Sequence, residues 1–482
     1  MDSPRRMPGL NCVNAEYVLT ALLIILGMHE TVTLAITKSA ATMSRVLGRG
    51  GGHALPGLIA ERIDPQLIQK LAAKLPNGII LVTGTNGKTT STKLIAAALE
   101  ANGERVLTNS TGSNLVRGVT SALIAAADIR GNIDATIGLF EVDEANLRLV
   151  APLLQPQHIV VLNLFRDQLD RYGELDTTAA MIGQGIAATK AKVYLNADDA
   201  LVASLARYAA APELVSYFGV DGLPLTAAPA HQTATDSDRC PFCGERMKFS
   251  QVFYSHLGHY ECPNGDYSRP VPEVSITRVD AADLEGVQFT VAVGGEHSEV
   301  TFPLPGTYNL YNALAAISVA AGLGVELPVL AKSLATTEAA YGRMEKVRLD
   351  GRTLYLLLIK NPVGFTQVLD TFLIGRPNLR VLMAVNDLAA DSRDVSWLWD
   401  VPLEALTESH PKVITAGTRG ADVALRLHYA GTEAEVATSL DEAITELVAE
   451  TPPGDGAYIL PTYTAMLQIR KLLAKRTHLQ DV

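Results

Sequence analysis

The sequence GIILVTGTNGKTTSTKLIAAAL, from Gly78 to Leu99, is the stretch that decides the fold. The apolar run from Ile79 to Val82 predicts a buried strand, and the Ala/Leu-rich run from Leu94 to Leu99 predicts a helix. A glycine-rich turn joins them. A strand, glycine loop and helix in this order point backbone N–H groups at a phosphate, and the helix N-terminus adds partial positive charge. The stretch therefore predicts a nucleotide triphosphate site.

The residues of this turn have separate predicted tasks. Lys88 is placed to reach the outer phosphates, and the Thr89 hydroxyl is placed to bind Mg²⁺. The turn departs from the strict GxxxxGK pattern, because only two residues separate Gly84 from Gly87. The predicted ATP-binding residues of the loop are Gly84, Thr85, Asn86, Gly87, Lys88, Thr89 and Thr90.

Length and composition set the outer limits. At roughly 150 residues per domain, 482 residues indicate about two or three domains. A net charge of -11 argues against a nucleic-acid partner or an anionic membrane surface, because both attract a basic face. Four cysteines, three of them clustered, do not resemble a secreted disulfide framework. We therefore expect a cytoplasmic protein that is at most peripheral to the membrane.

Residues 1–32 are interpreted as a doubtful leader. The apolar run from Tyr17 to Gly27 follows Arg5 and Arg6, as in a signal peptide, but it is too short to span a membrane. No recognisable small-residue cleavage site follows it. We expect this segment to be poorly ordered or non-native, with the true start further along the chain.

Strands and helices alternate after the phosphate loop, which predicts a mostly parallel α/β sheet. The predicted strand from Ala135 to Phe140 delivers Glu141 at its carboxyl end, where ligands bind in such sheets. Mg²⁺ prefers oxygen ligands, so Glu141 is predicted to hold the ion opposite Thr89. Further buried strands are predicted at His158–Leu162 and Lys192–Leu195.

The motif GTNGKTT, the strand that ends at Glu141, and Asn163 followed by DQLDRYG resemble the central ATPase domain of the Mur ligases. That family joins amino acids to a cell-wall precursor through an acyl phosphate. Two departures concern a second metal site of the family. Gln168 stands where the family has a histidine, and Met181 lies near the position of its carbamylated lysine.

A cysteine cluster lies in an inserted segment, residues 238–270, which we call the ribbon segment. Cys240, Cys243 and Cys262 resemble part of a zinc ribbon, in which four thiolates surround a structural Zn²⁺. Gly265 stands where a fourth cysteine is expected. The alternatives for a fourth ligand are Asp266, His256 and His259, and the absence of zinc is also open.

A ribbon inserted in a Mur-type ATPase domain resembles the MurT family, the ligase subunits of lipid II isoglutaminyl synthases. Later motifs agree: LPGTYNLYNALAA from Leu304, YGRMEKV with Arg343, the Lys360-Asn361-Pro362 segment, and the acidic element from Asn386. The resemblance implies that Asn309 and Asn312 lie at the adenine and that Arg343 lies near the phosphates of ATP.

Two domains are expected. Residues 33–306 form the ATPase domain, which carries the ribbon segment, and residues 307–482 form a smaller, Rossmann-like α/β domain. The predicted strands of the second domain are Thr353–Ile359, Leu379–Val385, Lys412–Ala416 and Ala457–Leu460.

The resemblance implies an amidation. ATP phosphorylates the α-carboxyl group of D-glutamate in the lipid II stem peptide, and ammonia displaces the phosphate to give D-isoglutamine. Ammonia is expected from a GatD-like glutaminase subunit in a heterodimer, because the cysteines of this chain do not resemble a glutaminase nucleophile. The resemblance implies that the acidic element lends an aspartate to the Cys-His pair of that subunit, and we predict Asp394, with Asp391 and Asp400 as alternatives.

Two other functions remain open. A stand-alone amino-acid ligase of the Mur or folylpolyglutamate type would use the same ATPase core without a partner. A non-catalytic, nucleotide-binding scaffold for a glutaminase would keep the fold alone.

Overall fold

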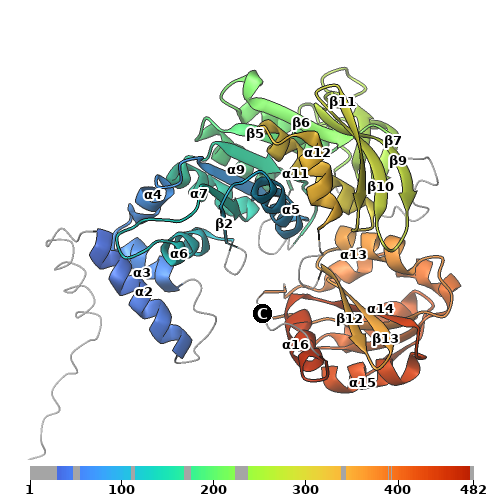
Figure 1. The fold of residues 1–482 in the computed structure, drawn as a ribbon. Coiled ribbons are helices and arrows are strands. Elements are labelled where there is room, and N and C mark those ends of the chain that lie inside the picture. Colours follow the sequence, from blue (N-terminus) through green and yellow to red (C-terminus); the bar gives the residue numbers. More distant parts are fainter. Residues whose placement is uncertain are drawn as a thin grey trace, which may run out of the picture.

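The computed structural model describes residues 30–46, 55–109, 114–167, 175–222, 237–337, 343–388, 390–391 and 393–477. Most of the predicted leader lies outside these residues, and its last residues begin helix α2 (Glu30–Val46). Two bodies are visible, each built around its own sheet (Figure 1). Among the described residues, no helix is both long enough and apolar enough to cross a bilayer.

The first sheet has nine strands in the described chain, in the order β11-β10-β9-β6-β5-β4-β1-β3-β2. They are β1 (Ile79–Thr83), β2 (Val106–Thr108), β3 (Ile137–Glu141), β4 (His158–Val161), β5 (Lys192–Asn196), β6 (Val215–Val220), β9 (Val274–Ala282), β10 (Val287–Val293) and β11 (Glu296–Phe302). Neighbours from β2 to β9 pair in parallel, and β9, β10 and β11 pair antiparallel. The prediction of a mostly parallel sheet is confirmed.

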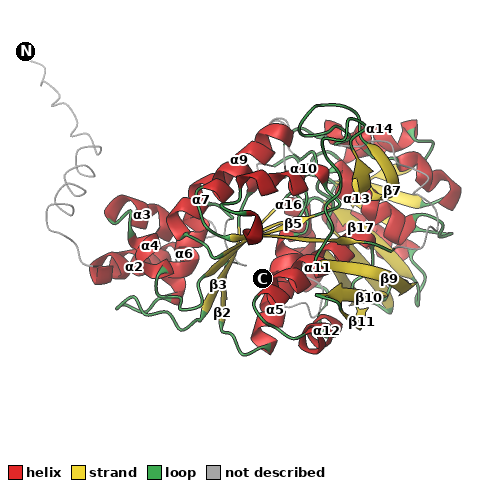
Figure 2. Ribbon diagram, turned by 90° about the horizontal axis from the view of Figure 1, so that it is seen from above, coloured by secondary structure: helices red, strands yellow, loops and turns green. Residues whose placement is uncertain are grey.

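The period of two along β1 places its side chains in two separate cores. Ile80 and Val82 belong to a core shared with helices α5 (Lys88–Ala101), α11 (Thr307–Gly322) and α12 (Leu327–Ala335). Ile79 and Leu81 face the opposite core. The helices of that core are α3 (Leu55–Ile63), α4 (Leu67–Ala72), α6 (Val116–Ala126), α7 (Leu147–Leu154) and α9 (Leu175–Ala187). Figure 2 shows α7 and α9 on one side of the sheet and α5, α11 and α12 on the other.

The ribbon segment is inserted between β6 and β9. It contains a two-stranded hairpin of β7 (Lys248–Tyr254) and β8 (Leu257–Glu261), which pair antiparallel. The short helix α10 (Ala200–Ala203) of the first body packs beside it, because Ala200 shares a small buried cluster with the ribbon segment.

The second sheet has the order β12-β13-β17-β14-β15-β16. Its strands are β12 (Arg343–Leu349), β13 (Arg352–Leu357), β14 (Arg380–Ala384), β15 (Lys412–Ala416), β16 (Ala434–Val436) and β17 (Gly456–Pro461). The helices of this part are α13 (Pro362–Val368), α14 (Gly420–Tyr429), α15 (Leu440–Glu450) and α16 (Tyr463–Ala474). Each of the four strands predicted for this region appears, within a few residues of its expected bounds.

The expected boundary at residue 306 stays a prediction, but the packing favours a later one. Helices α11 and α12 share a buried core with α5 and pack against it, and α12 also packs against β11, whereas β12 begins the second sheet. We therefore propose that the second domain begins near Arg343.

A half-buried histidine makes the stability of the first sheet depend on pH. His158 begins β4, and its Nδ1 lies 3.3 Å from the hydroxyl of Tyr194. Burial, together with the nearby charge of Lys192, lowers the pKa of His158 from 6.5 to about 4. Because the histidine of the unfolded chain binds its proton at higher pH, acidification favours the unfolded chain. The contribution of neutral His158 to the free energy of unfolding is therefore fully present above the pKa of the unfolded state, and it is lost as the pH falls toward the pKa of the folded state.

We expect the free energy of unfolding to fall less with acidification in His158→Gln than in the wild type. Between about pH 7.5 and about pH 5 the difference should reach at most about 2 kcal/mol. Urea unfolding of both proteins at the two pH values measures it. Parallel stability curves for the two proteins would contradict the prediction.

Candidate active site

The phosphate loop joins β1 to α5 through two glycines with positive φ. Gly84 has a φ of 129° and Gly87 a φ of 90°, and residues with a side chain rarely adopt such positive φ angles. A Cβ atom on Gly87 would lie 2.1 Å from Oδ1 of Asn312, so the loop has no room for a side chain at this position. Helix α5 begins directly after Gly87, and its N-terminus faces the turn.

Lys88 folds back over the loop that it follows. Its Nζ donates to the carbonyl oxygens of Gly84 at 2.5 Å and Thr85 at 3.3 Å, and it lies 3.2 Å from Oε2 of Glu144. Glu144 begins a short 3-10 helix, Glu144–Asn146, directly after β3. The side chains of Lys88 and Glu144 are only 11% and 9% exposed. Glu144 is thus a site residue that the sequence analysis did not assign.

Thr89 and Glu141, the predicted magnesium ligands, lie side by side. The Thr89 hydroxyl donates to Oε2 of Glu141 over 2.9 Å. The Asn109 side chain exchanges two hydrogen bonds with the backbone of Glu141, which fixes the end of β3. The pair offers a hydroxyl and a carboxylate oxygen side by side, a donor set that fits Mg²⁺.

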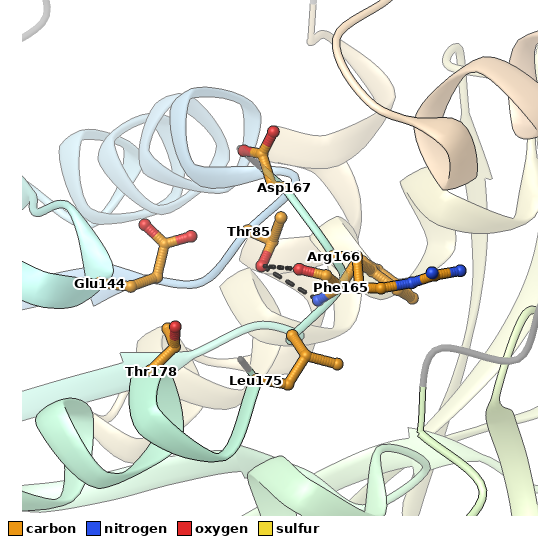
Figure 3. Close-up of a pocket in the computed structure, with 7 residues that line it drawn as sticks. All are labelled: Thr85, Glu144, Phe165, Arg166, Asp167, Leu175 and Thr178. Carbon is orange, nitrogen blue, oxygen red and sulfur yellow. Dashed lines mark hydrogen bonds between the residues drawn. The ribbon is translucent and has the colours of Figure 1, made fainter. Parts of the chain in front are cut away.

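The segment after β4 is hydrogen-bonded to two residues of the phosphate loop. Asn163 accepts from the N–H of Asn86 at 2.8 Å and donates to the carbonyl of the same residue at 3.0 Å. The Thr85 hydroxyl accepts from the N–H of Phe165 and donates to the carbonyl oxygen of Phe165 (Figure 3). Two successive residues of the loop are therefore held by residues nearly eighty positions away.

The second body reaches the same loop. Asn361, the N-cap of α13, exchanges two hydrogen bonds with the side chain of Asn86, at 3.0 and 3.3 Å. Its neighbour Lys360 lies 2.5 Å from Oδ2 of Asp167. The other oxygen of Asp167 is buried and has no hydrogen-bond partner in the described part of the chain.

A small pocket lies beside the phosphate loop (Figure 3). Its lining residues are Thr85, Glu144, Phe165, Arg166, Asp167, Leu175 and Thr178. Gln168, which replaces the family histidine, lies outside the described residues. The sequence analysis named neither Asp167 nor Lys360 as a site residue, although both stand in the motifs it quoted.

The remaining predicted nucleotide residues lie at two places. Asn309 and Asn312 are each 4% exposed at the start of α11. Asn312 donates to Oδ1 of Asn309 and accepts from the hydroxyl of Ser91 in α5, which ties α11 to the phosphate-loop helix. Arg343 begins β12, and its side chain lies outside the described part of the structure.

The acidic element separates the three candidate aspartates. Asp394 is exposed, and the Ser396 N–H donates to it at 2.8 Å, which lowers the pKa of its carboxyl group. Asp391 is buried and accepts from the backbone of Thr464 at the start of α16. Asp400 lies 4.0 Å from Arg166 of the first body. Asp391 therefore has a structural task, whereas Asp394 faces solvent.

The ribbon segment brings its three cysteines together. The Sγ atoms of Cys240, Cys243 and Cys262 all lie within 4.8 Å of one another, a spacing that fits three ligands of one zinc ion. Asp266 lies 3.9 Å from the sulfur of Cys262. His259 instead contacts the carbonyl of Val220.

Comparisons with known proteins agree with this geometry. Residues 82–264 match the family model of the Mur ligase middle domain, and residues 358–466 match the model of the MurT ligase C-terminal region. The chain is 33% identical over 456 residues to a protein of Streptococcus pneumoniae, the lipid II isoglutaminyl synthase (glutamine-hydrolyzing) subunit MurT. The match covers 94% of this chain and 98% of that protein. The chain belongs to the MurT family of Mur ligases.

Two further relatives support this membership. The MurT subunit of Staphylococcus aureus is 31% identical over 445 residues, which cover 91% of this chain and 96% of that protein. Among solved structures, a pseudomurein peptide ligase type C from Methanothermus fervidus shares the fold with a TM-score of 0.65. It is 21% identical and covers 84% of this chain and 80% of its own.

We predict that Lys88→Met both destabilises the protein and abolishes ATP hydrolysis. Removing one partner of a largely buried ion pair leaves Glu144 unpaired, which should cost about 3 kcal/mol. The double variant Lys88→Met/Glu144→Gln removes both charges and should regain most of that stability in thermal unfolding. Its ATP hydrolysis should still be reduced by about 100-fold or more, since the phosphate-binding cation is missing.

Glu144→Gln alone is the control for this pair. It keeps Lys88 and should retain ATP binding. Hydrolysis at the wild-type rate in the double variant would rule out the assigned role of Lys88.

Proposed function

We propose that this chain amidates the α-carboxyl group of D-glutamate in the lipid II stem peptide, with ATP as the energy source. ATP phosphorylates the carboxylate to an acyl phosphate and leaves as ADP. Ammonia then attacks the acyl carbon, inorganic phosphate leaves, and D-isoglutamine forms. The observation that carries this proposal is the end-to-end similarity to MurT subunits, combined with a phosphate loop that keeps its lysine, threonine and acidic partner.

The assigned tasks follow from charge. Lys88 binds the outer phosphates of ATP, and Gly84 to Thr90 supply N–H groups at the N-terminus of α5. Thr89 and Glu141 would hold Mg²⁺. When bound, that ion offsets the negative charge on the transferred phosphoryl group. Arg343, Asn309 and Asn312 complete the proposed nucleotide site.

The contacts between the two bodies suit a reaction that must exclude water. An acyl phosphate hydrolyses readily, so the site has to close before it forms. Two contacts join the bodies beside the pocket: Asn361 bonds to Asn86 of the phosphate loop, and Lys360 pairs with Asp167. We propose that Lys360 exchanges Asp167 for a phosphate or acyl-phosphate oxygen during the reaction.

A glutaminase subunit of the GatD type is the proposed source of ammonia. The cysteines in the described part of the chain all belong to the ribbon segment, so this part supplies no separate thiol nucleophile. Asp394 is exposed in the same chain segment as Trp399, and the surface around Trp399 suits protein contact. Trp399 and Tyr429 are 52% and 69% exposed there, and their rings lie 5.6 Å apart. Aromatic side chains of this kind are enriched at interfaces.

The expected test is an amidation assay with lipid II, ATP and Mg²⁺. The chain alone should amidate lipid II from ammonium, and from glutamine only when the glutaminase subunit is co-purified. Asp394→Asn should lose the glutamine route and keep the ammonium route, because the variant removes only the carboxylate lent to the partner. The product mass reports each outcome.

Asp400→Asn tests the alternative aspartate of the same element. It should keep the glutamine route, and loss of that route in Asp400→Asn but not in Asp394→Asn would assign the role to Asp400. Turnover with an amino acid and without a partner would favour a stand-alone ligase. ATP binding with no turnover from either nitrogen source would favour a scaffold.

We further propose that the ribbon segment binds one structural Zn²⁺ through Cys240, Cys243, Cys262 and Asp266. The carboxylate is the candidate fourth ligand that lies near the thiolate cluster, at 3.9 Å from the sulfur of Cys262. When bound, zinc cross-links the two ends of the segment.

The metal content of the purified protein tests this ligand set. Wild type should contain one zinc per chain, and Cys262→Ser should lose it. Asp266→Asn should release its zinc at a chelator concentration at least about tenfold lower than the wild type requires. Glu261→Gln, which changes the neighbouring exposed carboxylate, is the control. Retention of zinc by Asp266→Asn equal to that of the control would exclude Asp266 as a ligand.

The substrate implies the place of action. Lipid II is a lipid-linked precursor that reaches an ATP-dependent enzyme from the cytoplasmic side. We propose that the protein works in the cytoplasm at the inner face of the membrane, in peptidoglycan biosynthesis.

A further inference from the structure

The tip of the ribbon hairpin is buried rather than exposed. Ser255 and His256 form the turn between β7 and β8, and Ser255 has φ of 50°. The side chain of His256 is 0% exposed. Hairpin turns normally lie at the surface. This one inserts a histidine into the body that carries the phosphate loop.

His256 contacts two residues of that body. Its Nε2 lies 3.4 Å from Oδ2 of Asp199, and its ring centroid lies 5.1 Å from that of Phe165. Neither ring nitrogen has a hydrogen-bond partner in the described part of the structure, and the 3.4 Å approach to Asp199 is a longer polar contact. The contact with Asp199 is therefore the polar contact that this buried ring makes there.

Asp199 joins the ribbon segment to the segment after β4. Its carboxylate is fully buried and accepts from the N–H groups of Leu201 and Val202, each at 3.1 Å, as the cap of α10. The same carboxylate accepts from the N–H of Leu164 at 2.9 Å. Phe165, the next residue, holds the Thr85 hydroxyl in the phosphate loop.

The ribbon segment has a second anchor on the adjacent aspartate. Arg269, at the end of the segment, lies 2.5 Å from Oδ1 of Asp198 and 3.0 Å from Asp221. Tyr311 of α11 donates to the other oxygen of Asp198 at 2.7 Å. The segment is thus fixed at its tip and at its base to the same short turn before α10.

We infer that His256 is a positioning residue for ATP: it contacts Asp199, which accepts from the N–H of Leu164, and the next residue, Phe165, holds Thr85 in the phosphate loop. The ribbon segment then acts as a brace for nucleotide binding rather than as a separate interaction module. The inference rests on the proposed binding of ATP at this loop.

Its test compares two substitutions of the same histidine. His256→Phe keeps a ring against Phe165 but removes the polar contact with Asp199, and should weaken ATP binding by roughly tenfold. His256→Gln can still donate an N–H to Asp199 and should recover a large part of the affinity. The KM for ATP should rise in the Phe variant while kcat at saturating ATP stays within about twofold of wild type.

Hydrogen exchange of the ligand-free proteins gives an independent readout. Backbone amides of residues 84–87 and 163–165 should exchange faster in both variants, and faster in Phe than in Gln, whereas amides of the second sheet should not change. His259→Phe, in the same hairpin but bonded to Val220, is the matched control and should bind ATP like wild type. Calorimetry measures the affinities.

Equal ATP affinity and equal exchange in His256→Phe and wild type would overturn the inference. If His256→Phe does not fold, the comparison of His256→Gln with Asp199→Asn decides it. Both should accelerate exchange at 163–165 and weaken ATP binding, and the double variant should lose less than the sum of the two. Failure of the wild type to bind ATP would instead refute the proposed function.

Discussion

The turn between β1 and α5 takes its shape from hydrogen bonds made by residues far away in the sequence. Glycines at both ends free the backbone to adopt positive φ, but that freedom alone selects no single conformation. The two residues between the glycines, Thr85 and Asn86, are hydrogen-bonded by Phe165 and Asn163. Glu144 pairs with Lys88 on another side of the loop. The loop is therefore preorganised before any phosphate arrives. Preorganised N–H groups bind charge without reorganising when it arrives, which is what phosphoryl transfer requires.

The same turn is where the two bodies meet, so the proposed nucleotide binding and closure would involve the same atoms. Asn86 presents its backbone to Asn163 of the first body and its side chain to Asn361 of the second. A pair of neutral amide hydrogen bonds contributes on the order of 1 kcal/mol each, because water competes for both partners. Contacts of this strength hold a closed arrangement and still permit reopening for product release. The charged contact of Lys360 with Asp167 stands beside them, within reach of the proposed reaction.

Local patterns in the sequence predicted the strands and the phosphate loop, because apolar alternation and glycine spacing are local signals. The rule that ligands gather at the carboxyl ends of parallel strands predicted Glu141 as a magnesium ligand opposite Thr89; the two side chains are hydrogen-bonded, and their binding of the ion stays a prediction. The partners of Lys88 and Asn86 were not predicted. Glu144 is 56 residues from Lys88, and Asn361 is 275 residues from Asn86, so no spacing rule connects them. The start of α5 was also placed too late, since its first turn is rich in threonine and serine, which have low helix propensity. Likewise, no feature of the sequence shows that α11 and α12 pack on the sheet that precedes them.

The ribbon segment shows how an incomplete metal motif can keep its place in a fold. A four-thiolate zinc site contributes much of the folding energy of a small isolated ribbon. Here the cysteines also belong to an apolar cluster with Ala200, Met247 and Tyr260, and the hairpin tip and base are anchored on Asp199 and Asp198. Burial and these polar contacts supply order that an isolated ribbon takes from its metal. A weaker fourth ligand than cysteine is then tolerable, because the segment is held to the phosphate-loop body from three directions. Contact with that body therefore holds the segment in addition to any metal, and His256 is part of that contact.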